Sequence, residues 1–178
     1  MLLINIIMSN EKIIKVVICG ESNSGKSTFV KYHKHEIYDE NSKPTVGVEV
    51  HYLNWIDEEA ETNIRFNIWD CSGLPKYYDL LQTYWEDADA AIVFYCGISI
   101  SVYTVRLIND LRSKFGKNFP IIVCKSKFDL DGSNTNVTSA HVTNCFKNII
   151  FHALSTKNKY NVDDPFMLLS FHFSNVFK

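Results

Sequence analysis

Apolar runs of two kinds follow one another along the chain. Residues 13–19, 90–95 and 120–124 are nearly continuous apolar stretches rich in β-branched side chains, as in strands of a parallel sheet that are buried on both faces. Residues 101–115 lie between the last two of these stretches and have apolar side chains at helical spacing. The pattern predicts a strand–helix–strand crossover.

A second kind of run alternates between apolar and polar positions. Residues 47–55 and 64–69 do so on either side of a polar turn, which predicts an antiparallel hairpin near one edge of the sheet. Further patterns predict a helix over 137–147, a last strand over 149–154 and a closing helix over 162–176.

These elements predict an α/β fold. We expect a six-stranded, mostly parallel sheet with one antiparallel edge-side strand and about five helices. Residues 13–178 would form a single domain, with residues 1–12 as an N-terminal extension. A chain of 178 residues is long enough for one well-buried core without disulfides.

Composition narrows the function classes. The chain carries 18 Lys and Arg against 20 Asp and Glu, so no overall field attracts it to nucleic acid or anionic lipid. Its five cysteines are odd in number and lack metal-ligand spacing, which indicates reduced intracellular thiols. No internal repeat or second domain is visible.

The two ends of the sequence also bear on localisation. Residues 1–8 are apolar but lack the basic flank, cleavage site and length of a signal or membrane span; we expect an extended strand or a translation start at Met8. The last residues contain no cysteine that could be prenylated. We expect a soluble monomer without a membrane anchor.

A glycine-flanked loop follows the first predicted strand and precedes a helix. It matches the phosphate-binding P-loop pattern, whose backbone N–H groups and helix N-terminus bind phosphates. The lysine reaches the outer phosphates, and the serine after it is a magnesium ligand. The alternative, an accidental glycine-rich turn, does not explain this placement. The residues are Gly20, Glu21, Ser22, Asn23, Ser24, Gly25, Lys26 and Ser27, with Thr28 next in the helix.

Two further segments can approach the same phosphates. Thr45 precedes the second predicted strand, where a mobile threonine can close on magnesium and the terminal phosphate. Asp70 ends the third strand as a candidate magnesium ligand, and the Gly73 N–H can sense the last phosphate. The alternative for Thr45 is an ordinary surface turn.

A base pocket is predicted after the fifth strand. The carboxylate of Asp129 can accept hydrogen bonds from both N–H donors of guanine, while the stem of Lys127 covers the ring. Adenine offers no such pair of donors. Ser126 begins this motif.

Four more residues complete the predicted pocket. Ser155, Thr156 and Lys157 end the sixth strand, and this segment can supply a backbone N–H to the guanine carbonyl. Tyr38 can lie against the base edge. The alternatives are a plain loop and an ordinary half-exposed aromatic.

Taken in order, these five loops resemble the nucleotide-binding set of the Ras superfamily over residues 13–169. The resemblance implies a small GTPase that binds GTP, GDP and Mg²⁺, with Lys26, Thr45 and Gly73 in catalytic roles and Ser27, Thr45 and Asp70 as metal ligands. An alternative, a small P-loop kinase, lacks a visible arginine-rich lid and acceptor site.

Within that superfamily, the amino-acid sequences of residues 28–33, 46–51 and 64–69 are similar to those of the Ran subfamily, which acts in nuclear transport. This implies GTP-dependent binding of importin- and exportin-type receptors and of Ran regulators, and a location in nucleus and cytoplasm. Partners of the nucleic-acid class are not implied.

The departures from the family pattern predict a modified switch. Leu74 stands where the family has the glutamine that orients the attacking water, so we expect slow GTP hydrolysis. Ser126 replaces an asparagine, which predicts weaker base binding. Leu81 replaces an arginine, and Lys147 alone remains of a basic cluster. A GTP-locked or nucleotide-independent interaction module that interferes with small-GTPase pathways is the alternative function.

One histidine pair is assigned no chemistry. His33 and His35 are two apart in a predicted helix and therefore face different directions. We expect a solvated helix end there rather than a metal site.

Overall fold

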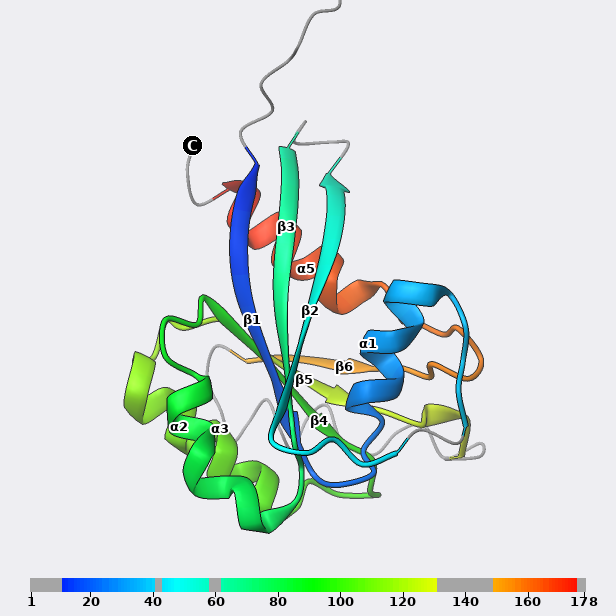
Figure 1. Cartoon of the computed structure of the whole chain (residues 1–178), viewed down its shortest axis with the longest axis vertical. Coiled ribbons are helices and arrows are strands. Elements are labelled where there is room, and N and C mark those ends of the chain that lie inside the picture. The colour runs from blue at the N-terminus through cyan, green and yellow to red at the C-terminus, as the bar shows by residue number, and fades with distance from the viewer. Residues whose placement is uncertain (1–10, 41–42, 58–61, 131–148, 176–178) are drawn as a thin grey trace, which may run out of the picture.

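The computed structural model describes residues 11–40, 43–57, 62–130 and 149–175. These residues form a six-stranded sheet with the order β2-β3-β1-β4-β5-β6 (Figure 1). Every neighbouring pair is parallel except β2 and β3, which form an antiparallel hairpin with β2 at the edge. The strands are β1 Lys12–Gly20, β2 Val48–Asp57, β3 Thr62–Cys71, β4 Ala90–Tyr95, β5 Ile121–Lys125 and β6 Ile150–Ala153.

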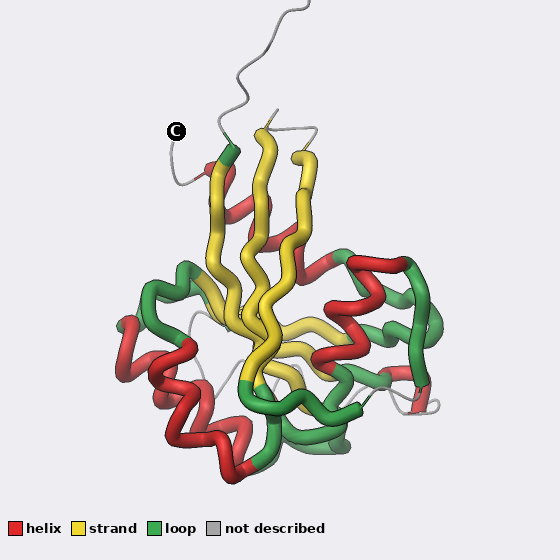
Figure 2. The backbone as a smooth tube through the Cα atoms, in the orientation of Figure 1, coloured by secondary structure: helices red, strands yellow, loops and turns green. Residues whose placement is uncertain are grey.

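Helices cover both faces of the sheet (Figures 1 and 2). On one face, α1 and α5 pack with Phe29, Phe66 and Phe166 in a common cluster. On the other face, α2 and α3 pack around Trp85 and Leu107. The helices are α1 Lys26–His35, α2 Leu81–Tyr84, α3 Val102–Phe115 and α5 Asp164–Asn175, with short 3₁₀ turns η1 Pro75–Leu80 and η2 Phe128–Leu130.

The central strand positions are buried from both sides, as the continuous apolar runs require. All six residues of β4 are buried, whereas in β3 buried and partly buried positions alternate. A two-sided core of this kind exists only where helices lie on both faces of parallel strands. The α/β fold, the mixed sheet and the antiparallel edge strand are therefore confirmed.

Some expectations lie outside the described residues. The helix predicted over 137–147 falls there, as do residues 1–10 and Cys145. Among the residues that the structure describes, Cys19, Cys71, Cys96 and Cys124 are free thiols. None of the described helices combines the length and apolar character needed to cross a membrane.

The carboxyl ends of the parallel strands meet at one edge of the sheet, where ligands bind in open α/β folds. The loops after β1, β3, β4, β5 and β6 all leave from this edge. At Gly20, the last residue of β1, φ is +139°, and an added Cβ would lie 2.1 Å from the carbonyl oxygen of Phe94 in β4. A side chain there would separate β1 from β4, so this close approach requires glycine.

Candidate functional site

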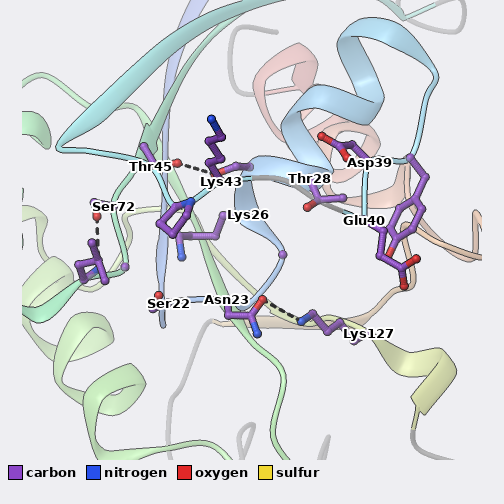
Figure 3. Close-up of a pocket in the computed structure, with 16 residues that line it drawn as sticks. Ser22, Asn23, Lys26, Thr28, Asp39, Glu40, Lys43, Thr45, Ser72 and Lys127 are labelled. Carbon is purple, nitrogen blue, oxygen red and sulfur yellow. Dashed lines mark hydrogen bonds between the residues drawn. The ribbon is translucent and has the colours of Figure 1, made fainter.

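Two adjoining hollows lie at this edge. The first, here called the phosphate cleft, runs between the P-loop, the loop before β2 and the loop after β3 (Figure 3). The second, the base pocket, lies between the P-loop and the loops after β5 and β6. The phosphate cleft is lined by Ser22, Asn23, Gly25, Lys26, Ser27, Thr28, Tyr38, Asp39, Glu40, Lys43, Pro44, Thr45, Ser72, Gly73, Leu74 and Lys127.

The base pocket shares part of that lining, so the two hollows form one continuous site. Gly25, Thr28 and Tyr38 border both. Five further predicted residues also line the base pocket: Ser126, Lys127, Asp129, Thr156 and Lys157. Of the predicted site residues, Gly20, Glu21, Ser24, Asp70 and Ser155 line neither hollow.

The N-terminus of α1 faces the phosphate cleft without a competing group. Its N-cap is Gly25 in the left-handed conformation, with φ 86°, and no side-chain hydrogen bond caps the helix in the described part of the chain. No acidic residue occupies the first turn. The first N–H groups of a helix need partners, and an anion such as phosphate satisfies them and the helix dipole together.

Lys26 places a cation at the base of the cleft. It is only 5% exposed, and its ammonium donates to the carbonyl oxygens of Gly20 at 3.0 Å and Glu21 at 2.6 Å. Burial lowers the pKa of Lys26, and the carboxylate of Asp70 opposes that effect. Because the two carbonyl partners are neutral, a phosphate would supply the charge that this buried ammonium lacks.

The three predicted metal ligands come together, although they lie far apart in sequence. The hydroxyls of Ser27 and Thr45 are 2.6 Å apart, and the Thr45 hydroxyl is 3.4 Å from Oδ2 of Asp70. Asp70 is fully buried, and its Oδ1 has no hydrogen-bond partner among the described residues. Burial raises the pKa of Asp70 to about 6, against hydrogen bonding from Ser27 and the charge of Lys26.

This arrangement fits a magnesium ion. Mg²⁺ prefers oxygen ligands and is commonly bound through one or two protein groups together with phosphate oxygens and water. Two hydroxyls and an unsatisfied buried carboxylate oxygen match that donor set. A cation there would also balance the charge of Asp70.

Gly73 and Leu74 close the cleft from the loop after β3. A Cβ added to Gly73 would lie 2.5 Å from the carbonyl carbon of Glu21 and from the nitrogen of Ser22, so the backbone of this loop lies directly on the P-loop. Leu74, the next residue, is apolar and lines the cleft, and its N–H donates to the Ser72 hydroxyl at 3.3 Å.

In the base pocket, Asp129 is held in place from behind. The hydroxyl of Ser155 donates to Asp129 Oδ1 at 2.5 Å, which fixes the carboxylate while Asp129 still borders the pocket. Lys157 pairs with Glu40 at 3.9 Å, linking the loop after β6 to the segment that carries Tyr38. Tyr38 is 37% exposed and borders both hollows.

Ser126 and Lys127 join the P-loop to the loop after β5. The Ser126 hydroxyl, almost completely buried, donates to the carbonyl oxygen of Ser24 at 2.6 Å and lies 3.1 Å from that of Tyr95. The Lys127 ammonium donates to Asn23 Oδ1 at 3.3 Å (Figure 3). The serine therefore still ties neighbouring loops together, although its single hydrogen is then used on a carbonyl.

A comparison with protein-family models agrees with this geometry. The model of the Ras family matches residues 15–174, which is most of the chain. The chain belongs to the Ras family. Membership supports a GTP-binding switch with a small-GTPase P-loop, and Ras-family proteins generally bind guanine nucleotide with Mg²⁺, hydrolyse GTP and contact regulators or effectors.

The Ras-family site contains residues that the sequence reasoning did not single out. Asp39, Glu40, Lys43, Pro44, Ser72 and Leu130 line it. Most of them lie next to Tyr38, Thr45 or Gly73 in the sequence, and this proximity is the feature from which they could have been predicted. Ser101 and Thr104, which contact Glu21, carried no such signal because they begin a helix far along the chain.

The solvated helix end expected at the C-terminus of α1 is only partly correct. His35 is exposed, but the side chain of His33 is 5% exposed and packs against Phe29 and Phe166 with ring centroids 4.5 and 4.9 Å away. Its Nδ1 lies 2.9 Å from the Phe29 carbonyl. The expectation is wrong for His33, because α5 folds over this ring.

Proposed function

We propose that this chain is a slowly hydrolysing, Ran-like guanine-nucleotide switch that acts in nucleocytoplasmic transport. The observation that carries the slow hydrolysis is the side chain of Leu74, which lines the phosphate cleft one residue after Gly73. An alkyl group neither donates nor accepts a hydrogen bond, so it cannot orient an attacking water.

The remaining residues of the cleft would bind the nucleotide normally. The N-terminus of α1 and the Lys26 ammonium would hold the phosphates, and Ser27, Thr45 and Asp70 would hold Mg²⁺. The ion would supply charge neutralisation to the phosphate oxygens. The Gly73 N–H would donate a hydrogen bond to the terminal phosphate, so the conformation of the loop after β3 would depend on whether that phosphate is present. With binding intact and water unpositioned, the GTP form would persist.

Guanine would be selected in the base pocket. The Asp129 carboxylate, fixed by Ser155, would accept from the two N–H donors on one edge of the base, with Lys127 and Tyr38 against its ring and a backbone N–H after β6 on its carbonyl. The Ser126 hydroxyl is directed to the Ser24 carbonyl, so it would add little to the base. Weaker base contacts would speed spontaneous exchange, which favours GTP where GTP is abundant.

The proposed transport role rests on sequence similarity. The similarity to the Ran subfamily in residues 28–33, 46–51 and 64–69 supports GTP-dependent binding of importin- and exportin-type receptors, in the nucleus and the cytoplasm. The last two segments overlap the β2–β3 hairpin, whose edge strand exposes Val50, Tyr52 and Ile56. An exposed edge strand with apolar side chains can bind a partner.

A nucleotide-independent interaction module is the second candidate function. Leu74 and Ser126 favour it, since both replace polar groups of the family site. The clustering of Ser27, Thr45 and Asp70 and the buried ammonium of Lys26 disfavour it, because a chain without nucleotide has no physical need for them.

Nucleotide content and single-turnover hydrolysis distinguish these functions. Protein purified from cells would be denatured, its nucleotide identified chromatographically, and hydrolysis followed in a parallel sample. We expect GTP in the wild type, slow decay, and at least a tenfold faster decay in Leu74→Gln. Leu74→Met, a matched apolar change, should stay slow. Mostly GDP in the wild type would refute the slow switch, and absence of guanine nucleotide would favour the second candidate.

The transport role needs a separate test. Immobilised protein loaded with GTP or with GDP would be incubated with a purified importin-β-type receptor. We expect retention by the GTP form only. Equal retention by both forms, or retention by neither, would refute the Ran-like role while leaving the nucleotide switch intact.

A further inference from the structure

One P-loop side chain points away from the nucleotide site. The carboxylate of Glu21 accepts hydrogen bonds through Oε1 from the hydroxyl of Ser101 and, at 3.2 Å, from that of Thr104. Ser101 is the N-cap of α3, and Thr104 lies fully buried in its first turn. A residue of the P-loop is thus hydrogen-bonded to the N-cap of a helix, 80 residues later in the chain.

The backbone of the same residue lies where the parts of the site meet. The Glu21 carbonyl accepts from the Lys26 ammonium at 2.6 Å and from the Ser24 hydroxyl at 2.7 Å. The backbone of Gly73 rests on the peptide between Glu21 and Ser22. Glu21 therefore connects α3, through its carboxylate, to the P-loop lysine and to the loop after β3.

This connection has a physical consequence for nucleotide release. The P-loop binds phosphate only when its N–H groups converge on one point, and nearby side-chain contacts determine how readily the loop leaves that conformation. Hydrogen bonds to a carboxylate are stronger than those between neutral groups. A loop held in this way loses less conformational entropy when nucleotide binds. It also opens less often once the nucleotide is bound.

We propose that Glu21 is a positioning residue of the nucleotide site: through Ser101 and Thr104 it fastens the P-loop to the first turn of α3 and thereby slows nucleotide release. Loss of this contact frees the loop beneath Lys26 and Gly73. The proposal rests on guanine-nucleotide binding, but it depends neither on slow hydrolysis nor on a transport role.

Release of a fluorescent GDP analogue tests the proposal. Loaded protein would be mixed with excess unlabelled GDP, and the release rate measured for the wild type, Glu21→Ala, Glu21→Gln and Thr104→Val. We expect about tenfold faster release for Glu21→Ala and about threefold for Thr104→Val. Glu21→Gln keeps an acceptor oxygen and should stay within about threefold of the wild type. Glu86→Ala, which removes an exposed carboxylate, should leave the rate unchanged.

The double variant Glu21→Ala/Thr104→Val gives the sharpest comparison. If the two residues act through one contact, its release rate equals that of Glu21→Ala alone, because residues that share an interaction are not additive. Multiplied effects would overturn the proposal. So would a Glu21→Ala rate within twofold of the wild type, even if thermal unfolding of the nucleotide-free protein shifts, since that result indicates a purely structural contact.

Two variants guard against misfolding. Should Glu21→Ala not fold, Thr104→Val, which preserves the Ser101 cap of α3, decides the question alone: an unchanged release rate would refute the proposal. A wild-type protein that binds no guanine nucleotide would overturn both this inference and the proposed function. Binding by the wild type with unchanged release in the variants would overturn this inference alone.

Discussion

The hydroxyl of Ser155 donates a hydrogen bond of 2.5 Å to Oδ1 of Asp129. The two residues follow different strands, β6 and β5, which are parallel neighbours in the sheet. Asp129 borders the base pocket and Ser155 lies behind it. The sheet thus places a hydroxyl where it holds the proposed guanine-reading carboxylate in one orientation.

Ser155→Ala should reduce selectivity for guanine more than it reduces affinity in general. Without the hydroxyl, the Asp129 carboxylate can rotate, and its proposed two-point contact with guanine would weaken. Inosine lacks the exocyclic amino donor and uses only one of the two contacts. We expect the preference for GDP over IDP, measured by competition, to fall about fivefold.

The comparison of the two nucleotides contains its own control. The Ser155 hydroxyl also accepts from the N–H of Asn158 at 3.1 Å, so the substitution can loosen the loop after β6. A loosened loop would weaken GDP and IDP equally. An unchanged preference would therefore contradict the orienting role of Ser155.

Replacing Ser126 tests a second departure from the family pattern. Its hydroxyl is used on the Ser24 carbonyl, so Ser126→Ala leaves a buried carbonyl unsatisfied and should speed GDP release several-fold. An asparagine has two donor hydrogens and can serve the carbonyl and the base together. We expect Ser126→Asn to bind GDP about tenfold more tightly than the wild type by titration calorimetry.

The two substitutions at Ser126 separate loop joining from base contact. Suppose that Ser126→Asn binds GDP no more tightly than the wild type while Ser126→Ala releases GDP faster. The contribution of this position to GDP binding would then be the loop-joining hydrogen bond that the serine already makes. Weak base binding by the wild type would then need another cause.

The sequence predicts the fold and the order of the site loops because both depend on local patterns. Continuous apolar runs give β1, β4 and β5, and the string from Gly20 to Ser27 requires a strand before it and a helix after it. The carboxyl ends of parallel strands then bring these loops together regardless of detail. Gly25, Lys26 and Asp129 could therefore be placed at the site from the sequence.

Tertiary contacts between distant segments could not be predicted in this way. Glu21 belongs to the P-loop string, yet its side chain turns to Ser101 on α3. Val102 fits the apolar helical spacing but is 87% exposed, although Thr104 in the same first turn of α3 is fully buried. His33 looks polar and surface-bound but is covered by α5. For Glu21 and His33 the contacting residues lie many positions away in the chain, and periodicity carries no information about them.

Ser27→Ala should uncouple nucleotide release from magnesium. Chelation of Mg²⁺ should speed GDP release from the wild type, because the cation would neutralise phosphate charge and would be held by Ser27, Thr45 and Asp70. Without the Ser27 hydroxyl, the ion loses a ligand, so release should already be fast at millimolar Mg²⁺. We expect chelation to change the variant's rate by less than about threefold, followed by fluorescence of a labelled GDP.

Ser24→Ala is the matched control, since this neighbouring serine donates to the Glu21 carbonyl and lies outside the metal cluster. It should retain the full response to chelation. A Ser27→Ala protein that responds to chelation as strongly as the wild type would contradict the assigned metal ligand.

The burial of His33 should make stability depend on pH. Burial among Phe29, Tyr32 and Phe166 lowers the pKa of His33, while the largely exposed Asp163, 3.3 Å from Nε2, raises it by a smaller amount. The folded protein therefore binds a proton less readily than the unfolded chain, whose histidine pKa is near 6.5. Stability from this group is complete above that value and declines as the pH falls below it.

Denaturant unfolding of the Mg²⁺- and GDP-loaded protein at pH 5 to 7.5 would measure this dependence. We expect the free energy of unfolding to fall toward pH 5 in the wild type and to fall less in His33→Phe, which keeps the ring packing without the titrating group. Burial also lowers the pKa of His51, so some dependence should remain. His35→Gln removes an exposed histidine and should match the wild type. If the free energy of unfolding of His33→Phe fell with decreasing pH as steeply as that of the wild type, the buried imidazole would not be the source of the pH dependence.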